Sequence, residues 1–187
     1  MNKPRIFLAS SILLLAALAC RMNLGGPTPS GQPIPVSTEA AGSLQQQFGQ
    51  ALQGSGPNGQ LTLTINEIQL TSLLAEKLAS TSDPLISDPQ VYLRDGQMQI
   101  YGKAKRGYFE ANVGIVLTPT IDANGQPLIE VTSADFGPVP VPENLNESIS
   151  SMVQEAYTGA LGPLATGFSL DSIVIADGVM TLTGRIR

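Results

Sequence analysis

One hairpin pattern occurs twice in this chain, and it constrains the fold more than any other feature. Residues 91–104 read VYLRDGQMQIYGKA, and residues 173–186 read IVIADGVMTLTGRI. At equal offsets both segments carry an Asp-Gly pair, a methionine two residues later and a second glycine. Asp-Gly is the preferred type I′ hairpin turn, because both turn residues need positive φ. Each segment is therefore expected to be a strand, a tight turn and a returning strand.

The two segments also share an apolar face on the returning strand. Met98, Ile100 and Gly102 alternate with polar residues in the first segment, as Met180, Leu182 and Gly184 do in the second. Any two hairpins resemble each other to some degree, which is the alternative explanation. Four identities and a common face favour one structural unit that is used twice.

The rest of the chain alternates between helical and strand periodicity. Strands that follow one another and are joined by turns predict an α+β fold, in which an antiparallel meander of about six or seven strands wraps around one or two helices. Either Asn66 with Gln69 or Thr64 with Glu67 offers a capping box for the second helix. The expected elements are helices over 38–53, 67–80 and 143–160, and further strands over 61–65, 108–118 and 128–136.

The N-terminus has the layout of a secretory signal. Two cations in residues 1–5 precede a 14-residue, largely apolar run over 6–19, which is shorter than the ~20 residues that span a bilayer. The run ends in Ala17-Leu18-Ala19-Cys20, which looks like a bacterial lipobox, although alanine stands where leucine is usual. The alternative is an ordinary signal peptide that ends near a cysteine. Because Cys20 is the only cysteine, we expect cleavage before it and its lipidation.

The expected domain organisation follows from this cleavage site. Residues 1–19 form the signal peptide, residues 20–37 form the lipidated cysteine with a Pro/Gly-rich tether, and residues 38–187 form one domain. Removal of residues 1–19 leaves 8 cations against 15 acids, a net charge of −7. Two or more acyl chains anchor a protein stably without a basic surface. We therefore expect a membrane-anchored protein of the cell envelope on the extracytoplasmic face.

The residue inventory is poor in catalytic chemistry. The chain has no histidine, the commonest general base, and one cysteine cannot form an internal disulfide or a thiolate metal cage. No nucleophile elbow or phosphate-binding glycine loop occurs, and the acids mostly occupy turns or helix starts. We expect no enzymatic activity, no metal and no cofactor. The pI of about 4.6 is acidic, whereas nucleic-acid binders usually carry a basic surface, so we expect no nucleic-acid partner.

One basic cluster stands out. Lys103, Lys105 and Arg106 lie within four residues and are followed by two aromatic residues. Contact with anionic lipid headgroups is one interpretation, in which each cation contributes on the order of 1 kcal/mol. The other is a charged edge strand that resists aggregation.

The element order resembles a known family. A strand running into a capped helix (LTLTINEIQLTSLLAEKL), a Pro-introduced helix (VPVPENLNESISSMV) and a terminal Asp-Gly hairpin are similar to small bacterial members of the tubular lipid-binding (TULIP) superfamily, especially LmeA-like phospholipid-binding proteins. The resemblance covers about Leu61 to Arg187. It implies a strongly curved half-barrel around a long helix, with lipid in an apolar groove. The lipobox and the Pro-rich tether depart from the LmeA-like pattern.

The expected function is binding of a phospholipid, fatty acyl chain or other hydrophobic ligand between the sheet and the helices. The alternative is a structural or adaptor lipoprotein that docks an envelope protein. The expected ligand-binding residues lie on the apolar faces: Leu70, Leu74, Leu78, Met98, Ile100, Phe109, Val113, Ile115, Leu117, Ile149, Met152, Val153, Met180 and Leu182.

Overall fold

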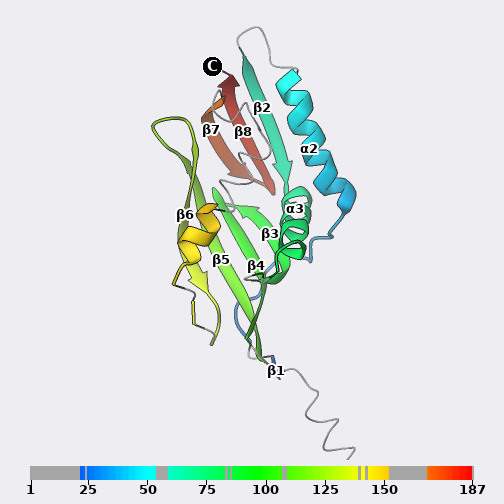
Figure 1. Ribbon diagram of the computed structural model, residues 1–187, viewed down its shortest axis with the longest axis vertical. Helices are drawn as coiled ribbons and strands as arrows, with labels where there is room; N and C mark the ends of the chain where they lie inside the picture. The colour runs from blue at the N-terminus through cyan, green and yellow to red at the C-terminus, as the bar shows by residue number, and fades with distance from the viewer. Residues whose placement is uncertain are drawn as a thin grey trace, which may run out of the picture.

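The computed structural model describes most of the chain beyond the N-terminal 21 residues. The described residues are 22–23, 25–53, 59–82, 84, 86–106, 109–138, 140–141, 143–151 and 168–186. Their elements are β1 (Met22–Asn23), α2 (Thr38–Gln53), β2 (Gln60–Asn66), α3 (Glu67–Ala79), β3 (Ser87–Arg94), β4 (Gln97–Arg106), β5 (Phe109–Ile121), β6 (Pro127–Asp135), β7 (Phe168–Ala176) and β8 (Val179–Ile186) (Figure 1). Residues 145–151 are also helical.

The described strands form two sheets. In the first, the order is β1-β5-β4-β3, and β6 pairs with the remaining part of β5. In the second, β8 lies between β2 and β7. All pairs are antiparallel except the short β1–β5 pair, and neither sheet closes on itself. The antiparallel α+β class is therefore confirmed, whereas the expectation of one continuous meander is wrong.

The second sheet forms because β8 takes its second partner from far along the chain. Leu63 pairs with Leu182 and Ile65 with Met180, so β2 is the neighbour of β8. In the first sheet, β5 has the equivalent place beside β4, where Ile115 pairs with Ile100. A meander assumes that strands adjacent in sequence also pair, and that assumption fails at β2.

The two Asp-Gly turns adopt the expected conformation. Asp95 and Gly96 have φ of 52° and 77°, and Asp177 and Gly178 have φ of 51° and 79°. The two turns also join the sheets, because the Gly96 amide donates to the Ile175 carbonyl. The hairpin prediction is confirmed in both copies.

Local capping sets where the helices begin. Of the two possible capping boxes, the structure contains the one in which Asn66 Oδ1 accepts from the Gln69 amide at 2.9 Å and Gln69 Oε1 accepts from the Asn66 amide at 3.0 Å. Ser37 Oγ accepts from the Ala40 amide at 3.2 Å and caps α2. Of the helix expected over 143–160, residues 145–151 are helical, residues 143–144 form a turn before it, and residues 152–160 lie outside the described residues.

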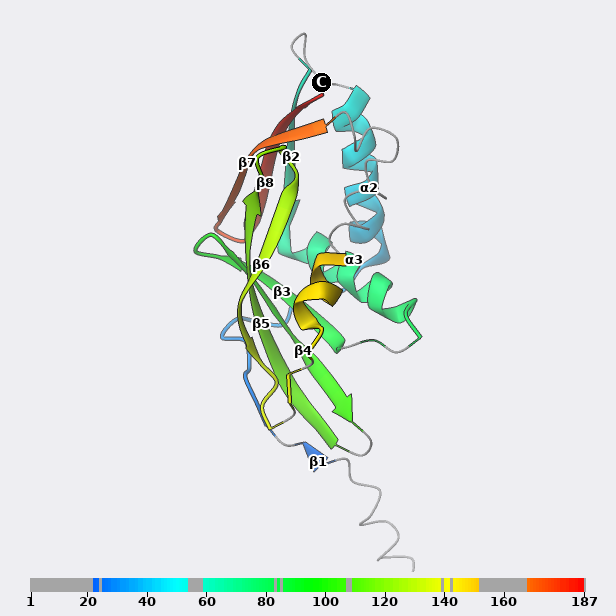
Figure 2. The ribbon, with the colours of Figure 1, turned by 60° about the vertical axis from the view of Figure 1, so that its left-hand side comes forward.

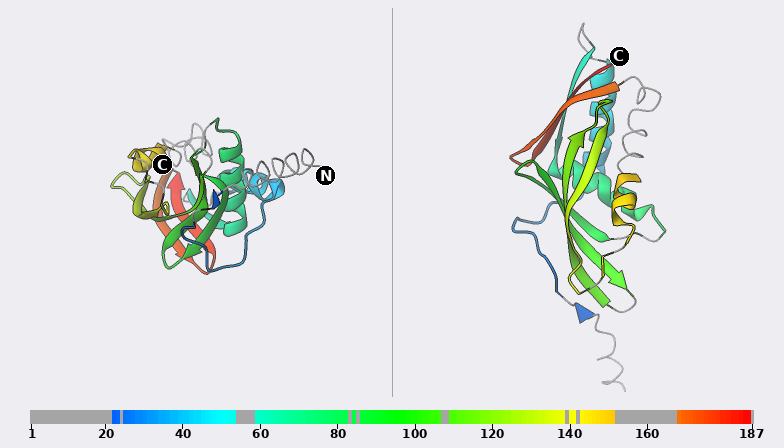
Figure 3. Two further views of the ribbon diagram at one scale, coloured as in Figure 1. Left: turned by 90° about the horizontal axis from the view of Figure 1, so that it is seen from below. Right: turned by 90° about the vertical axis from the view of Figure 1, so that its left-hand side faces the viewer.

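The helices and the N-terminal segment lie on opposite sides of the sheets. Helices α2, α3 and 145–151 lie on one face of the two sheets (Figures 2 and 3). Residues 25–33 run along the opposite face of the first sheet, in blue in Figure 3. The apolar interior lies between the sheets and the helices.

Candidate functional site

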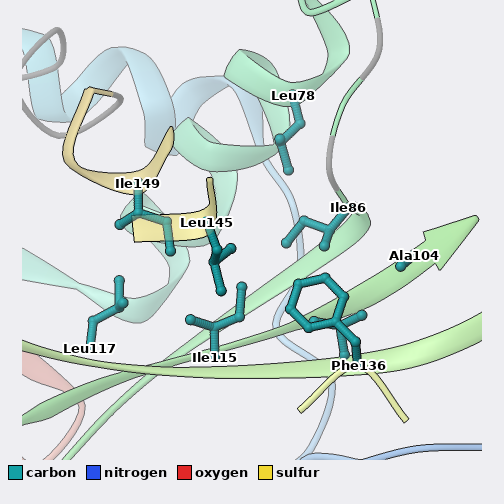
Figure 4. Close-up of a cluster of buried hydrophobic side chains, with 9 residues drawn as sticks. Leu78, Ile86, Ala104, Ile115, Leu117, Phe136, Leu145 and Ile149 are labelled. Carbon is teal, nitrogen blue, oxygen red and sulfur yellow. The ribbon is translucent and has the colours of Figure 1, made fainter. Parts of the chain in front are cut away.

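An apolar cluster lies between the first sheet and the helices. Figure 4 shows side chains of β5 and of Phe136 pointing toward side chains of α3 and of the helix at 145–151. Its centre is closed to solvent, since the exposed fraction of Val113 is 0%. The buried members are Leu78, Ile86, Ala104, Val113, Ile115, Leu117, Phe136, Leu145 and Ile149.

A second cluster lies under the second sheet, and it is continuous with the first. Met98 on β4 packs against both clusters, so one apolar interior extends beneath the two sheets. The buried members of the second cluster are Leu44, Leu63, Ile65, Leu93, Ile175 and Met180.

A further set of apolar side chains packs against these clusters but remains partly exposed to solvent. Helix α3 and strands β4, β6, β7 and β8 all contribute to it. In a fully packed domain, leucine and isoleucine at such inward positions are usually buried. This half-buried set comprises Leu70, Leu73, Leu74, Met98, Ile100, Ile129, Val131, Ala134, Ile173 and Leu182.

Helix α3 also leaves apolar side chains partly exposed. Its buried residues are Gln69, Thr71, Ser72 and Leu78, three of which are polar. Its other inward leucines, Leu70, Leu73 and Leu74, are only half-buried. The helix therefore buries polar groups while it leaves leucine side chains partly accessible beside the apolar interior.

The buried and half-buried polar groups of α3 have hydrogen-bond partners, which explains why their burial is tolerated. Thr71 Oγ1 accepts from the Val91 amide at 3.0 Å, and Glu67 Oε1 accepts from the Leu93 amide at 2.9 Å. Residues four apart on a helix rise ~6 Å and residues two apart on a strand rise ~6.6 Å, so the spacings match. Glu67 and Thr71 thus accept hydrogen bonds from amides on the edge of β3 that faces away from β4.

Two further contacts hold α3 against the N-terminal part of the chain. Ser72 Oγ accepts from the Ser37 amide at 3.0 Å, and Gln69 Nε2 donates to Ser43 Oγ at 3.1 Å. The polar side of α3 is therefore fixed by hydrogen bonds to β3, to α2 and to the segment before it. These bonds set the orientation in which its leucines face the interior.

The structure brings most of the expected ligand-binding residues together, but their exposure differs. Phe109 stands apart, because it is 48% exposed at the start of β5. Met152 and Val153 lie outside the described residues, as does Cys20. The half-buried members are Leu70, Leu74, Met98, Ile100 and Leu182, and the buried members are Leu78, Val113, Ile115, Leu117, Ile149 and Met180.

The lysines of the basic cluster are paired with carboxylates. Lys103 Nζ lies 3.2 Å from Asp88 Oδ2 and 3.6 Å from Glu110 Oε1, and Lys105 Nζ lies 3.8 Å from Glu110 Oε2. The hydrogen bond to Asp88 is the main cause that raises the pKa of Lys103. Two cations and two carboxylates leave this group of four with no net charge. Contact of Lys103, Lys105 and Arg106 with headgroups stays a prediction.

The alternative interpretation of this cluster, a charged edge strand, is wrong for Lys103, because β4 pairs there with β3 through Ser87 and with β5 through Asn112. At Lys105 and Arg106 the described pairing of β4 is with β5 alone, so for these two residues the interpretation stays a prediction. The two lysines lie on the polar face of β4 and pair across to Glu110 on β5.

Residues 25–37, expected to be part of a free tether, make specific contacts with the domain. The Asn112 amide donates to the Gly25 carbonyl at 2.8 Å, and the Tyr92 hydroxyl donates to the Gln32 carbonyl at 3.0 Å. A Cβ on Gly26 would lie 2.3 Å from the Asn112 carbonyl oxygen, so this close approach requires glycine. The glycines that suggested a flexible linker instead allow the chain to lie flat on the sheet.

Several residues of the apolar interior were not expected to contribute to the site. Leu73 appears in the leucine pattern of α3, and that pattern is the signal for it. Ile129, Val131 and Ala134 on β6 break simple alternation, because the β5–β6 register shifts between Val116 and Leu117. The inward set of β6 therefore could not be read from a period of two.

Within the described ranges, no helix combines the length and the apolar character that crossing a bilayer requires. In the same ranges, no three acidic or cysteine side chains gather as metal ligands would. Comparison of the chain with protein-family models, curated proteins and solved structures finds no match.

Proposed function

We propose that this protein is a lipid-anchored lipoprotein of the extracytoplasmic envelope, which binds a lipid or other hydrophobic ligand between its helices and its sheets. The observation that carries the proposal is that α3 buries polar side chains more completely than three of its leucines. Gln69, Thr71 and Ser72 are buried, while Leu70, Leu73 and Leu74 remain half-buried.

A ligand site explains this burial in energetic terms. Complete burial of a leucine side chain contributes about 1.5–3 kcal/mol, so half-buried leucines leave part of that free energy unused. An acyl chain against the half-buried set would complete the burial of Leu70, Leu73 and Leu74 on α3 and of Ile100 on β4. Apolar walls with few polar groups are typical of sites for hydrophobic ligands.

The other parts of the proposal come from the sequence. The lipobox motif at Ala17–Cys20 supports export and lipid anchoring, and the element order supports the resemblance to LmeA-like proteins of the TULIP superfamily. The half-barrel around a long helix, which this resemblance implies, is likewise part of the proposal. The absence of histidine from the chain favours binding over acid–base catalysis.

Ligand binding is tested by native mass spectrometry of the purified full chain and by titration with a fluorescent fatty acid. We expect copurified lipid and saturable uptake. Leu74→Gln should weaken uptake about ten-fold or more, since a polar amide replaces apolar contact of about 1.4 kcal/mol or more. Ile68→Gln is the matched control, because Ile68 is on the same helix and 40% exposed. Absence of both copurified lipid and uptake would contradict the ligand site.

Anchoring is tested separately by replacing Cys20 with serine. We expect Cys20→Ser to move the protein from the membrane fraction to the soluble fraction, because the thioether can no longer form. Unchanged membrane retention would contradict lipid anchoring. An anchored protein that takes up no lipid but remains in a complex with an envelope protein would favour the adaptor alternative.

A further inference from the structure

The N-terminal segment joins the fold at one end of the first sheet. Met22 pairs with Phe109 and Asn23 with Glu110, so β1 lies beside the start of β5. Figure 1 shows β1 at the lower end of the molecule, far from the C-terminus. The hydrogen bond from the Asn112 amide to the Gly25 carbonyl fixes the next residues to the same end.

The predicted lipidation site is very close to this end. Cys20 precedes Met22 by two residues, and consecutive Cα atoms are 3.8 Å apart, so the two Cα atoms are separated by at most about 7.6 Å. An acyl group on Cys20 therefore holds the start of β5 next to the membrane surface. Residues 25–37 add no free length, because they contact the domain.

Among the described side chains at this end, Phe109 is large, apolar and exposed. It is 48% exposed, while Ala111 and Val113, the next residues on the same face of β5, are 0% exposed. An exposed phenylalanine beside a lipid anchor has the bilayer interface as its nearest apolar environment.

We propose that this end of the domain, centred on Phe109, docks on the lipid bilayer that holds the anchor. Strand β5 then leads away from the membrane, and the β5–β6 turn lies at the far end. This inference rests on the lipid anchor of the proposed function, but not on the ligand site.

The lysines near Phe109 are paired with carboxylates, so the proposed contact with the bilayer is apolar. Lys103 and Lys105 are paired with Asp88 and Glu110, and the chain without its signal has a net charge of −7. The net charge therefore provides no attraction to anionic lipid. Docking through Phe109 should depend little on salt or on the anionic lipid content.

A single-tryptophan experiment tests this orientation, because the chain has no tryptophan. The full chain with Phe109→Trp is expressed, lipidated, purified in detergent and reconstituted in phosphatidylcholine vesicles that contain brominated acyl chains. Bromine quenches tryptophan fluorescence only at short range, so we expect at least two-fold quenching relative to unbrominated vesicles.

Leu128→Trp is the matched control. Leu128 is 55% exposed on the same sheet and pairs with Thr120, which lies eleven residues along β5 from Phe109. At ~3.3 Å per residue this places it about 36 Å further along the strand. We expect no quenching at this position. Quenching at both positions, or at neither, would overturn end-on docking.

Two additions keep the outcome interpretable. If Phe109→Trp does not fold by circular dichroism, Lys105→Trp reports on the same end, because Lys105 pairs with Glu110 across the β4–β5 ladder. If mass spectrometry finds Cys20 unmodified, the anchoring part of the proposed function fails. The single thiol is then coupled to a maleimide phospholipid, and the same quenching ratio decides the docking.

Discussion

The amide of Gly96 donates a hydrogen bond to the carbonyl of Ile175 at 3.2 Å, and the reciprocal bond joins the residues at equal offsets. The Gly178 amide donates to the Leu93 carbonyl, also at 3.2 Å. The two hairpins with the shared sequence pattern therefore meet through equivalent atoms, as two copies of one unit related by an approximate two-fold axis would. This relationship supports a repeated structural unit over the similarity expected of any two hairpins.

The two turn glycines should be sensitive to substitution. Gly96→Ala and Gly178→Ala place a Cβ at φ of 77° and 79°, which costs about 1–2 kcal/mol each in free energy of unfolding. Gly42→Ala is the control, because a Cβ there meets nothing within 4 Å and alanine is favoured in a helix by about 0.5–1 kcal/mol. Urea denaturation should show a lower free energy of unfolding for the two turn variants and a higher one for Gly42→Ala. Equal effects in all three variants would contradict the role of the turns.

The Thr71 hydroxyl should protect the edge of β3. Thr71→Val keeps the shape but leaves the buried Val91 amide without its acceptor, at a cost of about 1–3 kcal/mol. Thr71→Ser keeps the acceptor and loses only a methyl group, worth about 0.8 kcal/mol. Amide hydrogen exchange separates the two, because the Val91 amide should lose protection only in the valine variant.

Two leucines one turn apart on α3 should respond differently. Leu78 is 6% exposed in the first cluster, so Leu78→Ala should cost about 2–5 kcal/mol of stability. Leu74 is half-buried, so Leu74→Ala should cost less than about 2 kcal/mol but should weaken fatty-acid uptake. Thermal or urea unfolding and the uptake titration measure both effects. An equal stability loss with unchanged uptake would identify Leu74 as ordinary core.

The paired lysines should matter little for membrane binding. Headgroup contacts of about 1 kcal/mol per cation predict a loss of more than ten-fold for the double variant Lys103→Gln/Lys105→Gln. Because Asp88 and Glu110 already pair with these lysines, we expect less than a two-fold change in binding to anionic vesicles. Lys77→Gln, on α3, is the matched control for the loss of a cation.

Stability should decline in alkaline solution through Tyr92. Burial is the main cause that raises the pKa of its phenol above the usual 10.0, with a second contribution from Glu67. The unfolded chain then releases this proton at lower pH than the folded chain, so the stabilisation is present below pH 10 and is lost as pH rises through the folded pKa. Urea midpoints from pH 8 to 11 should fall less steeply in Tyr92→Phe. Parallel curves would contradict the assignment.

Local features of the fold could be predicted from the sequence because their causes are local. The turns at Asp95-Gly96 and Asp177-Gly178 and the cap at Asn66 depend on a few neighbouring residues. The inward face of β5 follows from strict alternation over Ala111, Val113 and the residues that follow. The α+β class was predictable because helical and strand periodicity are also local patterns.

Other features depend on contacts that no local pattern encodes. The pairing of β2 with β8 joins Leu63 to Leu182 and splits the expected sheet in two. Alternation alone assigned Phe109 to the interior, but it lies exposed at the end of its strand. The burial of the polar residues of α3 could not be predicted either. Thr71 is buried because its hydroxyl accepts a hydrogen bond from the Val91 amide on β3, and no local pattern around Thr71 indicates that contact.

The β2–β8 pairing also has a consequence for the order of folding events in the export that we propose. A chain that crosses a membrane N-terminus first delivers β2 115 residues before its partner, since Ile65 pairs with Met180. The first sheet has neighbouring strands and can assemble early, whereas β2 must wait beside it with an unpaired edge. Such long-range pairing slows folding because the loop must close before contacts form. The second sheet is therefore expected to form last.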